Sequence, residues 1–173
     1  MKKEEPKKDD VFIRMLTNMC KDRGTSAALR KYWSPTTTHY SYPILGRLRV
    51  PNHKHPDAIT ASLYAINPNH QNPGKSFAQA CLQLAGGSIK AQAFETFEPH
   101  MLRLLASSEL DELKQQLRRI SIRLERAGIP INYNRLMWDL RKWAKESEDI
   151  KTAWAMHFWQ APVEQIQTET TKV

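Results

Sequence analysis

The 173-residue sequence has few of the features typical of secreted, membrane or disulfide-rich proteins. Its only two cysteines, Cys20 and Cys81, lie among apolar neighbours in helical patterns. We therefore expect reduced, buried thiols and a cytoplasmic location rather than a disulfide framework. No apolar run approaches the ~20 residues of a membrane helix, and residues 1–6 lack the apolar segment of a secretory signal, so we expect no membrane partner.

Glycine is also scarce, and the six glycines do not form a phosphate-binding loop. Neither Gly86-Gly87 nor the stretch 72–75 matches a Walker loop or a dinucleotide-binding fingerprint. No carboxylates pair in a pattern that indicates acid–base catalysis, and Cys20 has no neighbouring histidine to make it a nucleophile. We expect no enzyme activity, no catalytic residue and no cofactor.

One segment, residues 53–57, has the composition of a metal site, because it contains His53, His55 and Asp57. The spacing is loose, the segment lies in a proline-rich region, and no cysteine or glutamate joins it. We interpret these residues as a polar loop that can add positive charge, and we predict no bound metal.

Apolar residues recur at helical spacing throughout the chain and alternating strand patterns are absent, which predicts an all-α fold. Between Glu109 and Trp159 the spacing predicts three consecutive helices, over 109–126, 132–145 and from 147 onward. Trp143 and Trp154 lie in the apolar stripes of these helices and are predicted to be core residues. Earlier helices are expected over 11–21, 25–33, 41–48, 57–66, 76–84 and 99–106, the last with Pro99 in its first turn.

The composition predicts two small helical bundles joined near residues 86–98. The first, residues 1–90, is basic with a proline-rich middle, since six of the ten prolines fall between Pro35 and Pro73. The second, residues 91–173, ends in a polar tail that begins at Pro162. Gly86-Gly87 is the candidate hinge between them.

Positive charge is concentrated in the first bundle. The net charge is +8, and residues 11–90 carry all of this excess, with ten Lys or Arg against only Asp22 and Asp57. Residues 91–173 contain twelve basic and twelve acidic residues. An excess of this kind favours a polyanionic partner, either nucleic acid or an anionic surface.

The candidate nucleic-acid-binding residues form small basic clusters on predicted helices. One row on the long helix advances ~5–6 Å per step, close to the spacing of successive phosphates. The alternative is a solvated surface on which Glu125 and Asp139 pair with some of these cations. The candidates are Arg30, Lys31, Arg47, Arg49, Arg118, Arg119, Arg123, Arg126 and Lys142.

Trp138 lies on the polar side of its predicted helix, among basic residues that include Arg141 and Lys142. A tryptophan there can stack on a base of a single strand. It can also pack against another helix or another subunit. The sequence leaves both interpretations open.

Three stretches resemble the CasB family, the small subunit of the type I-E CRISPR surveillance complex called Cascade. Residues 24–31 resemble its N-terminal motif, a glycine followed by a helix that ends in Leu or Ile and two basic residues. Leu117-Arg118-Arg119 resembles the basic pair on its long helix. Residues 131–143 and 153–159 resemble its closing signature.

The resemblance implies a non-catalytic protein with two helical bundles. Two copies are expected to lie head to tail, against the backbone and large subunits, near the crRNA–target DNA hybrid and the displaced DNA strand. Basic surface residues would hold the unwound DNA, and Arg30, Lys31, Arg47, Arg118 and Arg119 match the family at such positions. Arg123, Arg126 and Lys142 rest on the helical pattern alone, and Arg49 rests on its place in a small basic cluster with Arg47.

Two departures from the family affect this assignment. Ser26 stands where many relatives have a basic residue, and Pro99-His100 replaces a more basic helix start.

Two alternatives also remain: a purely structural adaptor in a ribonucleoprotein complex, and a stand-alone helical DNA-binding protein. The second lacks support in the proline-rich region, which contains no clean helix-turn-helix pair.

Overall fold

The computed structural model describes residues 8–160. Within this range every regular element is a helix, and the one β-type contact is an isolated bridge between His70 and Ile131. The predicted all-α fold is confirmed. None of the helices in this range is both long and apolar enough to cross a membrane. The elements are α1 Val11–Met19, α2 Arg23–Arg30, the 3₁₀-helices η1 Lys31–Trp33 and η2 Thr38–Ser41, α3 Tyr42–Arg47, α4 Pro56–Ile66, α5 Phe77–Leu84, α6 Gln92–Ala106, α7 Leu110–Arg126 and α8 Tyr133–Phe158.

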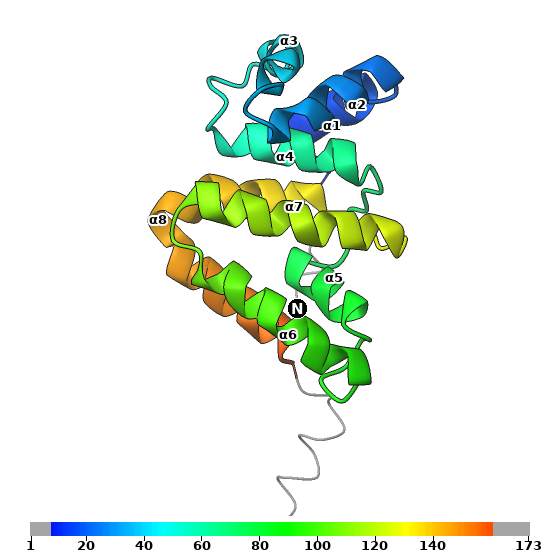
Figure 1. The fold of residues 1–173 in the computed structure, drawn as a ribbon, viewed down its shortest axis with the longest axis vertical. Helices are drawn as coiled ribbons and strands as arrows, with labels where there is room; N and C mark the ends of the chain where they lie inside the picture. The colour runs from blue at the N-terminus through cyan, green and yellow to red at the C-terminus, as the bar shows by residue number, and fades with distance from the viewer. Residues whose placement is uncertain (1–7, 161–173) are drawn as a thin grey trace, which may run out of the picture.

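The helices are arranged in three tiers (Figure 1). Helices α1 to α4 form one end of the molecule, α7 and the first part of α8 cross its middle, and α5 and α6 lie towards the other end. Helix α4 packs on both α7 and α8, and α5 also packs on α8. Helices α7 and α8 therefore hold both ends of the molecule together.

Helix α4 is buried on nearly every side, because it lies between α2 and the α7–α8 pair. Its sequence suits that position, since small and aliphatic residues such as Ala58, Ile59, Ala61 and Leu63 follow one another without a polar face. Pro56 occupies the first helical turn, where the missing N–H costs no hydrogen bond. The position of α4 therefore fixes α2 relative to α7 and α8.

The apolar stripe of the long helix α7 faces the core as its spacing predicted, with Leu113, Leu117, Ile120 and Leu124 buried. The two helices predicted after it are present as the two segments of α8, which meet at a kink where Glu146 has a non-helical backbone (φ −127°, ψ 24°). Apolar contacts on both sides of the kink keep the two segments together.

Trp143 and Trp154 come from opposite sides of that kink, and their ring centroids lie 5.7 Å apart. They are 2% and 1% exposed, so the prediction that both are core residues is confirmed.

Helix α6 begins at Gln92, so the prediction that this helix starts at Pro99 is wrong. Pro99 lies inside the helix. Phe94 and Phe97, which precede it, are buried, and their rings lie 4.9 and 5.8 Å from that of Phe158. Burial of two aromatic rings outweighs the local preference of proline for the first turn.

The helix predicted over residues 25–33 is also interrupted. The α-helix ends at Arg30, and the chain continues as the 3₁₀-helix η1. Gly86 and Gly87 end α5 with φ of +100° and +85°, a conformation that favours glycine. The predicted helix break is therefore present, whereas the division into two bundles near residues 86–98 stays a prediction.

Candidate nucleic-acid interface

The nine candidate residues are mostly exposed, and none is paired with an acid. Only Arg118 and Arg123 are half-buried; the other seven are exposed. None of the nine forms an ion pair with a carboxylate within residues 8–160. Asp139, one of the expected partners, instead accepts a hydrogen bond from the indole nitrogen of Trp154 at 2.9 Å. The cations therefore remain available for an external anion.

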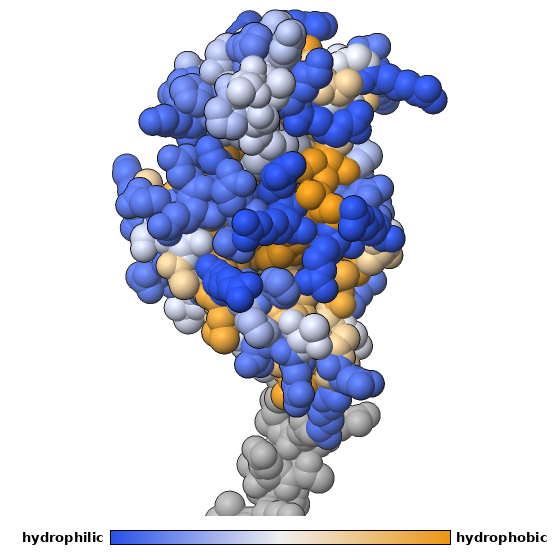
Figure 2. Space-filling model, in the orientation of Figure 1, coloured by the Kyte–Doolittle hydropathy of each residue, from blue (hydrophilic) through white to orange (hydrophobic). Residues whose placement is uncertain are grey.

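Hydrophilic side chains cover most of one face of the molecule, and Figure 2 shows this face in the orientation of Figure 1. Apolar surface gathers mainly in the middle of the face, between hydrophilic groups. Helix α7 crosses this part of the molecule in Figure 1. This face is therefore a mixed surface in which polar groups surround smaller apolar areas.

Packing of η1 on α7 joins the basic residues of the two halves of the chain. The guanidinium carbon of Arg118 lies 5.8 Å from the ring centroid of Trp33. One turn earlier on α7, the Lys114 nitrogen lies 5.7 Å from the Tyr32 ring centroid. Lys31 belongs to the same 3₁₀-turn as these aromatic rings. We call this junction of η1 with residues 114–119 of α7 the η1–α7 seam.

Local interactions at both ends of α2 position the N-terminal cations. Asp22 caps the helix by accepting a hydrogen bond from the Thr25 N–H at 2.9 Å. Hydrogen bonds from Thr25, and then the nearby charge of Arg47, lower the pKa of Asp22. At the other end, an outer nitrogen of Arg30 donates to the carbonyl of Ala65 at 3.4 Å. Leu29 is buried between these exposed groups and anchors the helix.

A second basic cluster surrounds His100 on α6. Burial is the main cause that lowers the pKa of His100, and the charges of Arg123, Arg103 and Arg119 lower it further. The guanidinium of Arg123 also lies 5.0 Å from the centroid of the Phe97 ring, which explains why it is half-buried. Helix α6 thus adds Arg103 to the row on α7, which the sequence patterns did not predict.

The remaining candidates lie apart from these clusters. Lys142 lines a pocket of about 230 Å³ that Asp139, Glu146 and Asp149 also line, so its surroundings carry charges of both signs. Arg49 is exposed after α3 with a φ of 59°, and Arg126 is the last residue of α7. These three positions remain predictions without a structural link to the seam.

Trp138 is 44% exposed, and its ring centroid lies 4.9 Å from the guanidinium carbon of Arg141. Arg141 also forms a two-pronged ion pair with Asp57 of α4, at 2.8 and 2.9 Å. This pair fixes one face of the tryptophan ring. Whether the other face meets a base or a protein stays a prediction.

The polar groups that could suggest catalysis or metal binding have structural roles. His55 Nδ1 accepts a hydrogen bond from the Asp57 N–H at 3.0 Å and caps α4. No group of three His, Cys, Asp or Glu side chains within residues 8–160 could hold a metal ion. Cys20 and Cys81 are free thiols whose pKa values burial raises. Cys81 is buried as predicted, whereas Cys20 is only half-buried.

Several solved structures share this fold. The Cse2-family protein from Thermus thermophilus matches with a TM-score of 0.69 at 22% identity, covering 87% of this chain and 96% of that one. CasB from Thermobifida fusca gives a TM-score of 0.66 at 20% identity, with coverage of 86% and 93%. CasB from M. ruber gives 0.67 at 18% identity, with coverage of 98% and 100%. At these identities the likeness shows the fold alone.

The sequence itself carries the family assignment. Comparison with curated proteins gives no match. The family described as "CRISPR-associated protein Cse2 (CRISPR_cse2)" matches over residues 25–159, which is most of the chain and includes both sides of the η1–α7 seam. The chain therefore belongs to the Cse2, or CasB, family of CRISPR-associated proteins.

Proposed function

We propose that this chain is a non-catalytic small subunit of a type I-E CRISPR effector complex of the Cascade kind. In this role it holds the backbone of unwound target DNA, above all the displaced strand of the R-loop, and so contributes to antiviral defence. Its partners are a second copy of the chain, the backbone and large subunits, and the crRNA–target DNA hybrid.

The observation that carries the proposal is the η1–α7 seam. The motif that contains Lys31 meets the motif that contains Arg118 there, because Trp33, two residues after Lys31, packs beside Arg118. Neither cation has a carboxylate partner within residues 8–160. A surface of unpaired cations attracts the phosphate backbone and releases the counterions condensed on it.

Such contacts suit a protein that must hold DNA of any sequence. Phosphate contacts position a strand but carry no sequence information. In RNA-guided recognition, base pairing with the guide supplies the sequence specificity. The small subunit then needs only to track the backbone, which the arginines of α7 can do.

Exposed apolar side chains are available for the protein partners. Val11, Leu102, Trp138 and Met156 are all large apolar residues with exposed surface. Contacts through such residues would keep the subunit in the complex, while the cations contact the nucleic acid. The two roles are then separable by mutation.

The test uses the assembled complex with charge reversals in this subunit. We expect Arg118→Glu with Arg119→Glu, or Arg30→Glu, to leave assembly intact but to reduce the fraction of target DNA held open. Lys90→Glu is the matched control, because Lys90 is an exposed cation outside the candidate set. If the reversed subunit assembles and the DNA remains open as before, the subunit is a structural adaptor.

A further inference from the structure

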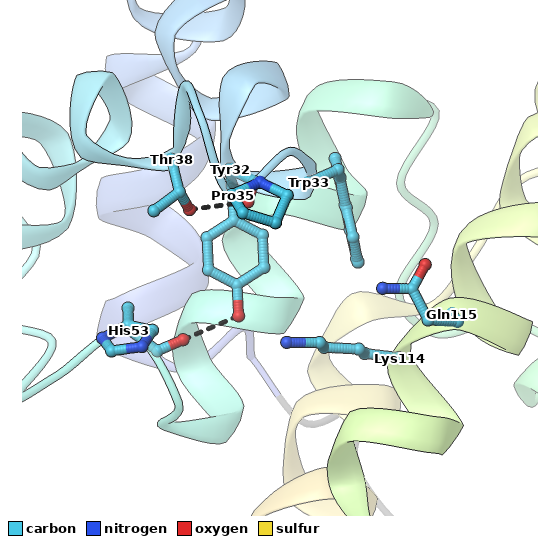
Figure 3. Close-up of a pocket in the computed structure, with 7 residues that line it drawn as sticks. All are labelled: Tyr32, Trp33, Pro35, Thr38, His53, Lys114 and Gln115. Carbon is cyan, nitrogen blue, oxygen red and sulfur yellow. Dashed lines mark hydrogen bonds between the residues drawn. The ribbon is translucent and has the colours of Figure 1, made fainter.

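A pocket of about 370 Å³ lies at the η1–α7 seam (Figure 3). Tyr32 and Trp33 form two of its walls; their ring centroids are 5.2 Å apart and their planes are inclined at 83°. Pro35 lines a third side, and Lys114 and Gln115 reach in from α7. The pocket therefore has two flat aromatic walls that are nearly perpendicular to each other.

Hydrogen bonds hold the Tyr32 wall in place without a ligand. The Tyr32 hydroxyl donates to the carbonyl of His53, and the Thr38 hydroxyl donates to the carbonyl of Tyr32, both at 2.6 Å. Burial is the main cause that raises the pKa of Tyr32 to about 12. A preformed wall spares a ligand the cost of ordering side chains.

Lys114 brings a positive charge to the pocket. Lys114 pairs with Asp111 at 3.0 Å, which occupies one of the three hydrogens of its ammonium group. Nε of Arg118 and Nε1 of Trp33, both beside the pocket, are buried and have no acceptor in the described part of the chain. The remaining hydrogens of the Lys114 ammonium group can contact an anionic group of a ligand.

We propose that this pocket receives one unstacked base of a single-stranded nucleic acid, while Lys114 and Arg118 contact the phosphates on either side of it. This proposal rests on the proposed function, because it adds a base contact to the backbone contacts made there. A base stacks on one aromatic wall and meets the other with its edge, the two favourable geometries for ring pairs. The pocket volume lies near the lower end of the ~300–1,000 Å³ of small-molecule sites, which suits one base.

Full-length protein and two single strands of equal length test the proposal: an oligothymidylate and its abasic counterpart, which has the same phosphates without bases. Indole N–H signals in ¹H–¹⁵N spectra report on each tryptophan, and Trp33→Phe identifies the signal of Trp33. We expect that signal to shift with the oligothymidylate alone. The oligothymidylate should bind about 5- to 150-fold more tightly than the abasic strand, the range that stacking on one aromatic residue supplies.

Variants then separate the base contact from the phosphate contacts. Trp33→Ala should bring the two affinities together, and Lys114→Ala should weaken both strands alike. Lys90→Ala, an exposed lysine away from the seam, should change neither. If Trp33→Ala does not fold, the wild-type spectra with the two strands still decide the question.

The outcomes distinguish this proposal from the proposed function. Equal affinity for both strands without a Trp33 signal shift overturns the base pocket and leaves backbone binding in place. Absence of binding to either strand at low salt and spectroscopic protein concentrations overturns both. A Trp33 signal that shifts equally with polyglutamate would assign the pocket to acidic protein segments and overturn the nucleotide assignment.

Discussion

Replacing Trp143 with alanine should remove a large part of the stability of this protein. The side chain is 2% exposed, its ring packs against Trp154, and its indole nitrogen donates to the carbonyl of Ser108 at 3.3 Å. Truncation of a buried tryptophan costs about 3–5 kcal/mol. Ser108 is exposed, so water can replace the lost donor and adds little to that cost. In a protein of this size the loss corresponds to a fall in Tm of about 6–20 °C.

Trp138→Ala is the matched control, because it removes the same side chain from the same helix at a position that is 44% exposed. It loses the contact with Arg141, worth about 0.5–1 kcal/mol at an exposed site, and part of its apolar burial. Urea unfolding followed by far-UV circular dichroism measures both variants without using tryptophan fluorescence. Equal midpoints for the two would refute the assignment of Trp143 to the core.

Three further predictions follow from buried polar groups. Arg141→Met should lower the free energy of unfolding in urea by up to about 3 kcal/mol, because it leaves the carboxylate of Asp57, which is 8% exposed, without its partner. Adding Asp57→Asn should recover part of this loss, and additive effects of the two substitutions would contradict the pairing. Burial raises the pKa of Asp139 above 3.8, so the folded protein favours the protonated carboxyl. The free energy of unfolding of the wild type, relative to that of Asp139→Asn, should therefore be greatest below pH 3.8 and fall as the pH rises through the raised pKa. A difference between the two proteins that does not change with pH would refute this. A thiol reagent should modify half-buried Cys20 before buried Cys81 in the native protein and both together in urea, and equal native rates would contradict the burial.

Helical spacing predicted the helices of the core because burial selects one face of each helix. The stripe of α7 illustrates this, since Leu113 to Leu124 recur at the spacing that faces the neighbouring helices. Pro99 misled the prediction because its local preference is weaker than the burial of Phe94 and Phe97 against Phe158. That contact joins α6 to the far end of α8, and no local pattern specifies it.

The candidate site was only partly predictable for the same reason. Charge clustering identified Lys31 and Arg118 separately, but their connection depends on Trp33 packing against α7. Lys114 and Arg103 were missed because each resembles an ordinary surface cation in its own helix. Their neighbours in the fold, the Tyr32 ring and the cluster around His100, are what suit them to binding anions.

The most direct test of the account is the salt dependence of DNA retention by the assembled complex. Each phosphate contact to a single strand contributes a slope of about −0.7 in log affinity against log salt. Arg118→Glu with Arg119→Glu should therefore flatten the slope by about 1.4, equally for targets of different sequence, and should weaken retention most at low salt. An unchanged slope with the reversed subunit present in the complex would contradict the claim that these arginines hold the phosphate backbone.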